Sequence, residues 1–203
     1  LDVSRDLATS ALASLLEERR VVVEPGGSHT AKIAVYRPRL HQAEVGIATR
    51  LHQALDHNAS SPADGSDWAQ RLAHFESRHS ISFSAHQREA IQRSLVEKVL
   101  VITGGPGTGK TTLVQAVVDL HALNEHRILL AAPTGRAAKR MQEATGFEAK
   151  TLHRLLEFQP SAMTFLRNRD RPLEADLVIV DETSMLDCSL AAHLLDSLAD
   201  DCR

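Results

Sequence analysis

The chain has 203 residues, of which 43% are hydrophobic and 24% are charged, and its formal net charge is −3. This balance is typical of a globular protein with a core of its own, and it excludes a strongly basic surface overall. A nucleic-acid site would therefore be a local patch. The two cysteines, Cys188 and Cys202, form no C-x-x-C motif, and the 11 histidines form no H-E-x-x-H pattern, so we expect reduced thiols and no site built from His and Cys ligands.

No segment of the sequence is long and apolar enough to cross a membrane, which takes roughly 18 apolar residues. The first residues, LDVSRDLATS, lack the basic and apolar regions of a signal peptide. We therefore expect a cytoplasmic location and no membrane partner. The chain has no initiator Met and stops at DDCR in the middle of a pattern, so we also expect it to be a piece of a longer protein.

Residues 1–60 predict a small α+β region. Apolar residues at helical spacing predict a helix over 4–19, and the segments VVVE and AKIAVYRP around PGGS predict a β-hairpin after it. A second helix is expected around 40–57. This order fits the end of a winged-helix-type unit, and it fits any other small α+β cap equally well. The Ser, Pro, Gly and Asp content of 60–67 predicts a linker, so we place the domain boundary there and assign 61–83 to linker and helix.

Beyond the linker, apolar strands alternate with helices, which is the pattern of a parallel sheet covered on both faces. The sequence therefore predicts an α/β fold for the rest of the chain. The expected elements are helices over 68–79 and 84–97, a strand over 99–103, a helix over 110–123, a strand over 128–132, helices over 136–144 and 151–156, a strand over 177–181 and an amphipathic stretch over 188–199.

Residues 99–112 read VLVITGGPGTGKTT, in which Gly104 to Thr111 matches G-x-x-x-x-G-K-[ST] at every fixed position. Glycines let backbone N–H groups turn toward a polyphosphate, and the following helix adds its positive N-terminal end. We expect Lys110 to reach the β- and γ-phosphates and the Thr111 hydroxyl to ligate Mg²⁺. The predicted cofactors are ATP and Mg²⁺. The predicted nucleotide-binding residues in this loop are Gly105, Pro106, Gly107, Thr108, Gly109, Lys110, Thr111 and Thr112.

A second motif, the acidic segment LVIVDE at 177–182, places two carboxylates at the end of an apolar strand. Asp181 is expected to hold Mg²⁺ opposite Thr111, and Glu182 to orient and activate the attacking water. An apolar run followed by Asp-Glu is a weak indication by itself, but it gains weight beside the phosphate loop. We take Lys110, Asp181 and Glu182 as the candidate catalytic residues. The acidic second position favours hydrolysis over phosphoryl transfer to a small acceptor.

The segment APTGRAAKRM at 132–141 follows another short apolar run. A Pro-Thr-Gly turn at a strand end presents a hydroxyl, backbone N–H groups and two cations, which are the groups that position the phosphates of a nucleic-acid backbone. A solvated helix start with ordinary surface charges explains the same residues equally well. The residues alone leave both interpretations open.

Four segments in this order, ITGGPGTGKTT, APTGRAAKRM, ATGFEAKTLHRLL and DLVIVDETSM, together resemble the first motor domain of a RecD/TraA-family helicase of superfamily 1B. The resemblance is strong over 84–199 and weaker over 1–60. It implies a P-loop NTPase (RecA-like) fold, with 84–203 as the first part of motor domain 1. It also implies an ATP-dependent DNA helicase that moves 5′→3′ on single-stranded DNA in recombination and repair. Alternatives are a P-loop kinase and a non-catalytic nucleotide-binding subunit of a nuclease–helicase complex.

The same resemblance implies roles for further residues. Gln87, in FSAHQREAI, would read adenine, although Ser84 and Gln87 also fit a helix-capping box. His153 would contact DNA, although a lone histidine is as often a packing residue. The residues implied to contact single-stranded DNA are Pro133, Thr134, Gly135, Arg136, Thr151 and His153.

Two features that the family pattern requires are absent from the sequence. The motif GD-x-x-Q-L does not follow the acidic segment LVIVDE in these 203 residues, and they include no second motor domain that would supply arginines to the γ-phosphate. Such arginines contribute roughly 10³–10⁵-fold to the rate in related NTPases. We therefore expect this chain to bind ATP and Mg²⁺ but to hydrolyse ATP poorly and unwind no DNA. The resemblance leaves open whether the parent protein acts alone or in a nuclease–helicase complex such as exodeoxyribonuclease V.

Overall fold

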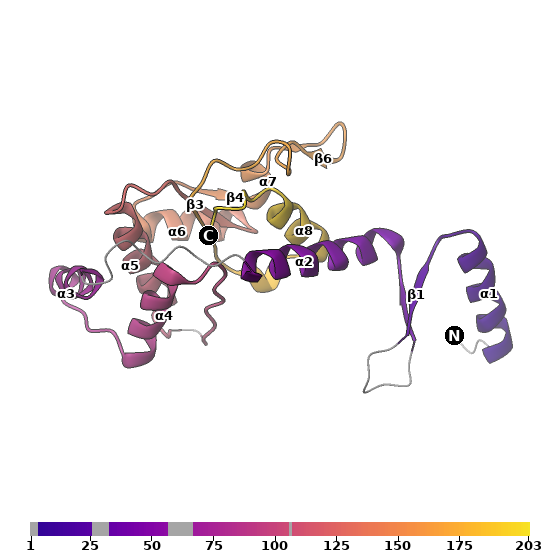
Figure 1. Cartoon of the computed structure of the whole chain (residues 1–203), viewed down its shortest axis with the longest axis horizontal. Coiled ribbons are helices and arrows are strands. Elements are labelled where there is room, and N and C mark those ends of the chain that lie inside the picture. The colour runs from indigo at the N-terminus through magenta and orange to yellow at the C-terminus, as the bar shows by residue number, and fades with distance from the viewer. Residues whose placement is uncertain (1–3, 26–32, 57–66, 106) are drawn as a thin grey trace.

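The computed structural model describes residues 4–25, 33–56, 67–105 and 107–203 (Figure 1). The N-terminal region begins with a helix that Ser4 caps, because the Ser4 hydroxyl accepts a hydrogen bond from Leu7 N at 3.3 Å. An antiparallel hairpin and a long helix follow, and all four predicted elements of this region are confirmed. Nearly all of the PGGS turn and of the predicted linker lies outside the described residues. The elements are α1 (Arg5–Glu17), β1 (Val22–Glu24), β2 (Ala34–Tyr36) and α2 (Pro38–Asp56).

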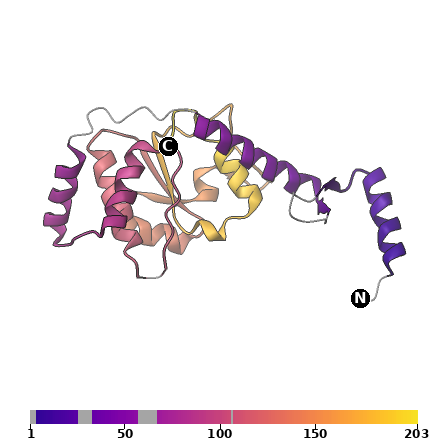
Figure 2. The same ribbon diagram turned by 60° about the horizontal axis from the view of Figure 1, so that its bottom comes forward.

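Helix α2 connects this region to the rest of the molecule, because it packs along helix α8 (Cys188–Asp196) (Figure 2). The Arg50 guanidinium donates to Leu195 O at 3.1 Å and to Leu198 O at 2.6 Å. Leu195 lies in the last turn of α8, and Leu198 lies two residues beyond the end of this helix. The contact crosses the domain boundary predicted near residue 60. That boundary stays a prediction.

A parallel sheet of three strands, in the order β4-β3-β7, lies at the centre of the larger part. Its strands are β3 (Ile128–Ala132), β4 (Ala149–Thr151) and β7 (Leu177–Val180). In the register of the sheet, Leu130 lies opposite Ile179 and Ala132 lies opposite Thr151. The strands over 128–132 and 177–181 were both predicted. Strand β4 was not, because AKT contains no apolar run.

Helices cover both faces of the sheet (Figure 2). Alternate residues of each strand point to opposite faces. Leu130 and Leu177 pack on one face with α3, α4, α5 and α6, and Ala131 and Val178 pack on the other with α7 and α8. The predicted α/β fold, a parallel sheet with flanking helices, is thus confirmed. The remaining elements are α3 (Trp68–His79), α4 (Ala85–Val96), α5 (Lys110–Ala122), α6 (Gly135–Thr145), α7 (Leu152–Leu155), β5 (Phe158–Gln159), β6 (Thr164–Phe165) and the 3₁₀ turn η1 (Thr183–Met185).

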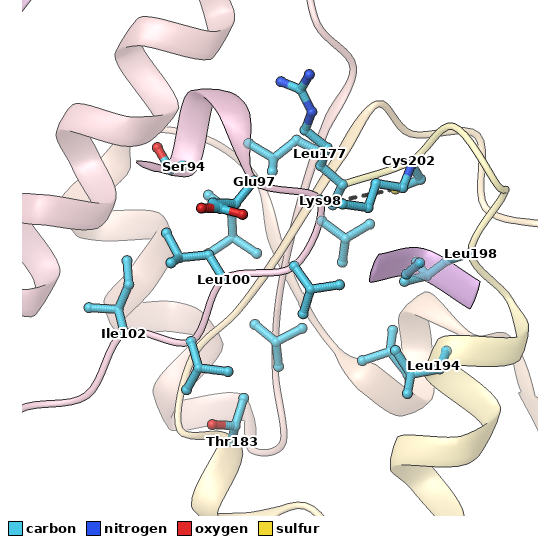
Figure 3. Close-up of a pocket in the computed structure, with 18 of the residues that line it drawn as sticks. Ser94, Glu97, Lys98, Leu100, Ile102, Leu177, Thr183, Leu194, Leu198 and Cys202 are labelled. Atoms are coloured by element: carbon cyan, nitrogen blue, oxygen red, sulfur yellow. Dashed lines mark hydrogen bonds between the residues drawn. The ribbon is translucent and has the colours of Figure 1, made fainter. Parts of the chain in front are cut away.

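The predicted strand over 99–103 is wrong, since these residues join no sheet and the Val101 side chain is 81% exposed. A strand forms only where a neighbour takes up its N–H and C=O groups. The edge of β7 that faces this segment bonds elsewhere, because Val178 N donates to Arg203 O at 2.7 Å. A cavity of about 360 Å³, here called the large cavity, lies between them. Figure 3 shows Leu100 and Ile102 on one side of it and Leu194 and Leu198 on the other.

Candidate active site

The phosphate loop ends where helix α5 begins, and its backbone needs glycine. Gly107 and Gly109 have φ angles of 74° and 78°, in the left-handed region that residues with a side chain rarely adopt. The Lys110 ammonium folds over the loop and donates to Gly104 O at 2.5 Å and to Gly105 O at 2.7 Å. The predicted loop residue Pro106 lies outside the described residues.

The start of α5 presents, beside this loop, backbone N–H groups that the helix itself does not take up. The first helical hydrogen bond runs from Leu113 N to Gly109 O at 2.9 Å, so the N–H groups of the three preceding residues have no partner within the helix. These N–H groups belong to Lys110, Thr111 and Thr112. Thr111 is exposed and Thr112 is half-buried. A helix N-terminus with such donors and an adjacent ammonium suits a phosphate group.

The two predicted carboxylates lie at the carboxyl end of β7. Asp181 N donates to Ala131 O at 3.0 Å, which extends the parallel pairing with β3 by one residue. Glu182 follows with φ 53° and ψ 40°, a left-handed conformation that costs a residue with a side chain on the order of 1 kcal/mol. Glu182 N donates to Asp181 Oδ1 at 2.8 Å, which stabilises this turn. The turn holds Asp181 half-buried and Glu182 exposed at the sheet edge.

The phosphate loop and the acidic turn meet at a cavity of about 90 Å³, here called the small cavity. Lys110 and Thr111 line it from α5, and Asp181 and Glu182 line it from the end of β7. The tertiary structure therefore brings together the residues that two separate motifs predicted. The large cavity also reaches Lys110 and Asp181, but apolar side chains dominate its lining. We assign phosphate chemistry to the small cavity, because Thr111 and Glu182 line it together with Lys110 and Asp181, whereas neither Thr111 nor Glu182 lines the large cavity.

Arg140 also lines the small cavity, and the sequence did not point to it. It lies on α6, one turn after Arg136, so the spacing of four residues in GRAAKR was the available signal. Its neighbour Lys139 pairs with Glu143, with 3.7 Å between Nζ and Oε1. Within the described part of the chain, Arg140 has no ion pair of its own. An exposed guanidinium beside the phosphate loop suits an anionic oxygen.

Gln87 uses both ends of its side-chain amide within the protein. Its Oε1 accepts from Ser84 N at 2.8 Å, and its backbone N donates to Ser84 Oγ at 3.3 Å, which forms the capping box at the start of α4. Its Nε2 donates to Thr108 O at 2.9 Å, in the phosphate loop. The contact of Gln87 with adenine stays a prediction.

The residues predicted to contact DNA lie at the same carboxyl edge of the sheet, where β3 and β4 end side by side. The Thr134 hydroxyl caps α6 by accepting from Ala137 N at 3.3 Å. The Thr151 hydroxyl likewise caps α7 by accepting from Arg154 N at 3.3 Å. Both hydroxyls thus have a structural role already. The other predicted DNA-contacting residues between β3 and α6 are Pro133, which is half-buried, and Gly135 and Arg136, which are exposed.

His153 is exposed, but its ring belongs to an aromatic cluster. The ring centroids of His153 and Phe158 are 5.4 Å apart, and those of His153 and Phe165 are 5.6 Å apart. Phe165 in turn lies 4.7 Å from His193. These contacts give the packing interpretation a physical basis, while a DNA contact of His153 stays a prediction.

The part of the chain that the structure describes holds no group of three or more His, Cys, Asp or Glu side chains that could bind a metal ion. Thr111 and Asp181 would therefore need oxygens from a nucleotide and water to complete a Mg²⁺ shell. Among the described helices, none is both long and apolar enough to span a bilayer.

Known proteins similar to this chain include P-loop proteins and helicases. A family model described as an AAA domain matches residues 87–203, which include the phosphate loop and the acidic turn. The ATP-dependent RecD2 DNA helicase of Deinococcus radiodurans is 35% identical over 187 residues, which cover 91% of this chain and 25% of that protein.

Two further relatives are RecBCD enzyme subunits named RecD. The protein of Mycolicibacterium smegmatis is 40% identical over 136 residues, covering 55% of this chain and 24% of its own length. The protein of Haemophilus influenzae is 31% identical over 178 residues, covering 75% of this chain and 25% of its own length. The resemblance to RecD-like helicases is thereby confirmed. This chain spans about a quarter of the length of these relatives.

Proposed function

Because this chain belongs to the AAA domain family of P-loop NTPases, we propose that it is the ATP-binding part of a DNA helicase. The proposal rests chiefly on the small cavity. There a lysine and a threonine at a helix N-terminus face two carboxylates at a strand end. The names of its relatives, a RecD2 DNA helicase and RecBCD subunits, support this choice among the activities of P-loop proteins.

The substrate in this proposal is ATP. Lys110 and the N–H groups at the start of α5 bind its phosphates, and the exposed Glu182 carboxylate accepts a proton from the attacking water. Mg²⁺, held by Thr111 and Asp181, would neutralise charge on the phosphate oxygens. Among these groups, Glu182 alone accepts a proton from the attacking water. It therefore contributes to hydrolysis of ATP and not to binding of ATP. We propose weak hydrolysis for the 203-residue chain by itself, since it spans only about a quarter of the length of these relatives.

Single-stranded DNA is the second ligand of the proposal. Residues 133–136 and Thr151 lie where two neighbouring parallel strands end, the edge of such sheets at which ligands bind. Exposed Arg136 and the backbone N–H groups at the start of α6 suit the phosphates of a DNA strand. The 5′→3′ direction and a role in recombination and repair follow from the resemblance to RecD-like helicases. Its relatives named as RecBCD subunits support a place in a nuclease–helicase complex.

Two other functions remain as alternatives to be tested. A P-loop kinase would transfer the γ-phosphate to a small acceptor, which the pair Asp181–Glu182 does not favour. A non-catalytic subunit would use nucleotide only to hold a conformation. Both share the phosphate loop with the helicase, so binding of ATP alone does not separate them.

The deciding experiment replaces Lys110 with alanine in a chain extended to the length of its relatives. We expect Lys110→Ala to abolish ATP binding and unwinding while DNA binding persists, and Lys139→Ala to leave ATP binding unchanged as a matched control. Unwinding measured on a strand-displacement substrate and ATP binding measured by fluorescent nucleotide titration give the two readouts. Undiminished unwinding by Lys110→Ala would favour a non-catalytic role. DNA-independent transfer of phosphate to a small acceptor would favour a kinase.

A further inference from the structure

We propose that Arg50 anchors the N-terminal region to the ATP-binding part, and that ATP binding strengthens this attachment. The connection runs through residues 195–200, here called the α8 exit, which comprise the end of α8 and the four residues after it. The inference rests on the proposed binding of ATP. It adds a link between that site and a region of the molecule that lies outside it.

The Arg50 side chain makes three bonds to the α8 exit. Its Nε donates to Leu195 O at 3.1 Å, its Nη2 to Leu198 O at 2.6 Å and its Nη1 to Asp200 Oδ1 at 3.2 Å. The Arg50 side chain is 13% exposed, so water competes little for its donors. A guanidinium presents its donors in a fixed plane and serves three acceptors at once, whereas a lysine ammonium is a single point charge.

The end of α2 that carries Arg50 lies beside a cavity and not on a packed core. Within the described residues of α2, Ala43 alone is buried, and it lies two turns before Arg50. Arg50 and Leu51 line the large cavity, as do Leu195 and Leu198 of the α8 exit. Few buried apolar contacts lower the free energy needed to open an element locally. The bonds of Arg50 therefore matter for keeping this end of α2 in place.

The α8 exit is joined to both sides of the proposed ATP site. On one side, Lys98 Nζ donates to Asp200 O at 2.6 Å, and Lys98 directly precedes the segment that runs to the phosphate loop. On the other side, α8 begins soon after the acidic turn, where Asp187 Oδ1 caps the helix by accepting from Leu190 N at 2.8 Å. The two connections thus lead to the two walls of the small cavity.

ATP and Mg²⁺ would bridge these two walls, because Thr111 lies on one of them and Asp181 on the other. A ligand that holds both walls restricts the motion of the segments behind them, including the α8 exit. Arg50 then binds acceptors that are already ordered, so α2 is attached more firmly. Linkage requires the reverse effect as well, since attachment through Arg50 must strengthen ATP binding by the same factor.

The test compares Arg50→Ala with Arg39→Ala, a matched control in the first turn of the same helix, where Arg39 is exposed. Hydrogen exchange of the 203-residue chain is followed by mass spectrometry with and without ATP and Mg²⁺, and ATP affinity is measured by calorimetry. We expect ATP to slow exchange over residues 47–56 and 195–200 of the unmodified chain. Arg39→Ala should behave in the same way.

In Arg50→Ala, residues 47–56 should exchange faster without ATP, and ATP should no longer slow their exchange. ATP should also bind roughly fivefold more weakly, at the lower end of the usual coupling between two sites. Arg50→Lys should give intermediate values, because it retains the charge but not the planar fork.

Three results would overturn the inference. The first is an equal slowing by ATP over residues 47–56 in Arg50→Ala and in the unmodified chain. The second is ATP binding to the unmodified chain without any change over these residues. The third is an unchanged ATP affinity in Arg50→Ala.

If Arg50→Ala does not fold, Lys98→Met tests the same connection from its other side, because it removes the bond to Asp200 O. The slowing by ATP over residues 47–56 should then be lost, and its persistence would overturn the inference. Failure of the unmodified chain to bind ATP would instead overturn the proposed function, while faster exchange over 47–56 in Arg50→Lys would still support the anchor.

Discussion

The phosphate loop and the Asp181–Glu182 turn line opposite sides of the small cavity, but they are built in different ways. The loop obtains its shape locally, from glycines at positive φ and from the start of α5. The segment before it, 99–103, joins no sheet. The acidic turn follows β7, whose position depends on pairing with β3 along its full length.

This difference shows that the two motifs carry different kinds of information. Residues Gly104 to Thr111 obtain most of their conformation from nearby residues, through glycines at positive φ and the helix that follows, and Gln87 of α4 adds one bond from Nε2 to Thr108 O at 2.9 Å. Asp181 reaches the cavity only because its strand is paired, as the bond from Asp181 N to Ala131 O shows. Substitutions on the two sides of the small cavity should therefore have different effects, and the following experiments test that difference.

The largest expected effect separates hydrolysis from binding at the two sides of the small cavity. Glu182→Gln should lower ATP hydrolysis by about 10²–10⁴-fold, the range for loss of a general base, while ATP affinity stays within about twofold. Lys110→Ala should lower affinity itself, because it removes the cation of the loop. Single-turnover hydrolysis and nucleotide titration, both on a chain of the relatives' length, measure the two effects. Equal loss of affinity in both variants would contradict the assigned roles.

A second effect is a pH dependence of the free energy of unfolding of the chain, caused by His121 on α5, the helix that begins at the phosphate loop. Burial, followed by the charge of His126, lowers the pKa of His121 to about 4. Unfolded histidine titrates near 6.5, so between these values the unfolded chain binds a proton that the folded chain does not. The free energy of unfolding should therefore fall by up to about 3 kcal/mol as pH drops from above 6.5 toward 4.

Urea titrations at pH 7.5 and pH 5 check this expectation. His121→Phe fills a similar volume and does not titrate, so it should flatten the pH dependence over this range. Its stability above pH 7 serves as the control for packing. An unchanged pH dependence in His121→Phe would show that another group is responsible.

A third experiment compares two valines, one on each side of the large cavity. Val178 is half-buried in β7 and packs with the core, so Val178→Ala should lower the free energy of unfolding by about 1.5–2 kcal/mol. Val101 is 81% exposed in the segment before the loop, so Val101→Ala should change it by less than about 0.5 kcal/mol. Urea denaturation of the 203-residue chain gives both values. Equal costs would mean that the segment before the loop packs as firmly as β7.

The smallest expected effect concerns Arg140, the cation that α6 adds between the two sides. Arg140→Gln should slow DNA-independent ATP hydrolysis by roughly tenfold, as for one charge-assisted hydrogen bond to a phosphate oxygen. Arg140→Lys should restore part of the rate, because it retains the charge but not the planar fork. Lys139→Gln, one residue away and paired with Glu143, is the matched control. A rate unchanged by Arg140→Gln would assign this arginine to the surface.

The sequence by itself determined the features that depend on neighbouring residues. These are the glycine loop with Lys110 and Thr111, the helix cap at Ser84, and the apolar run that becomes β7. Each follows from spacing, from φ preferences or from a hydroxyl three residues before an N–H, and none needs a distant partner.

Only the tertiary structure decided which segments pair and which side chains meet. It left 99–103 outside the sheet, formed β4 from a segment without an apolar run, placed Arg140 at the small cavity and joined Gln87 to Thr108. Strand pairing and cavity lining depend on residues far apart in the chain, and one sequence does not show which of them come together. For this reason the motifs indicated a site, while the fold determined which side chains line it.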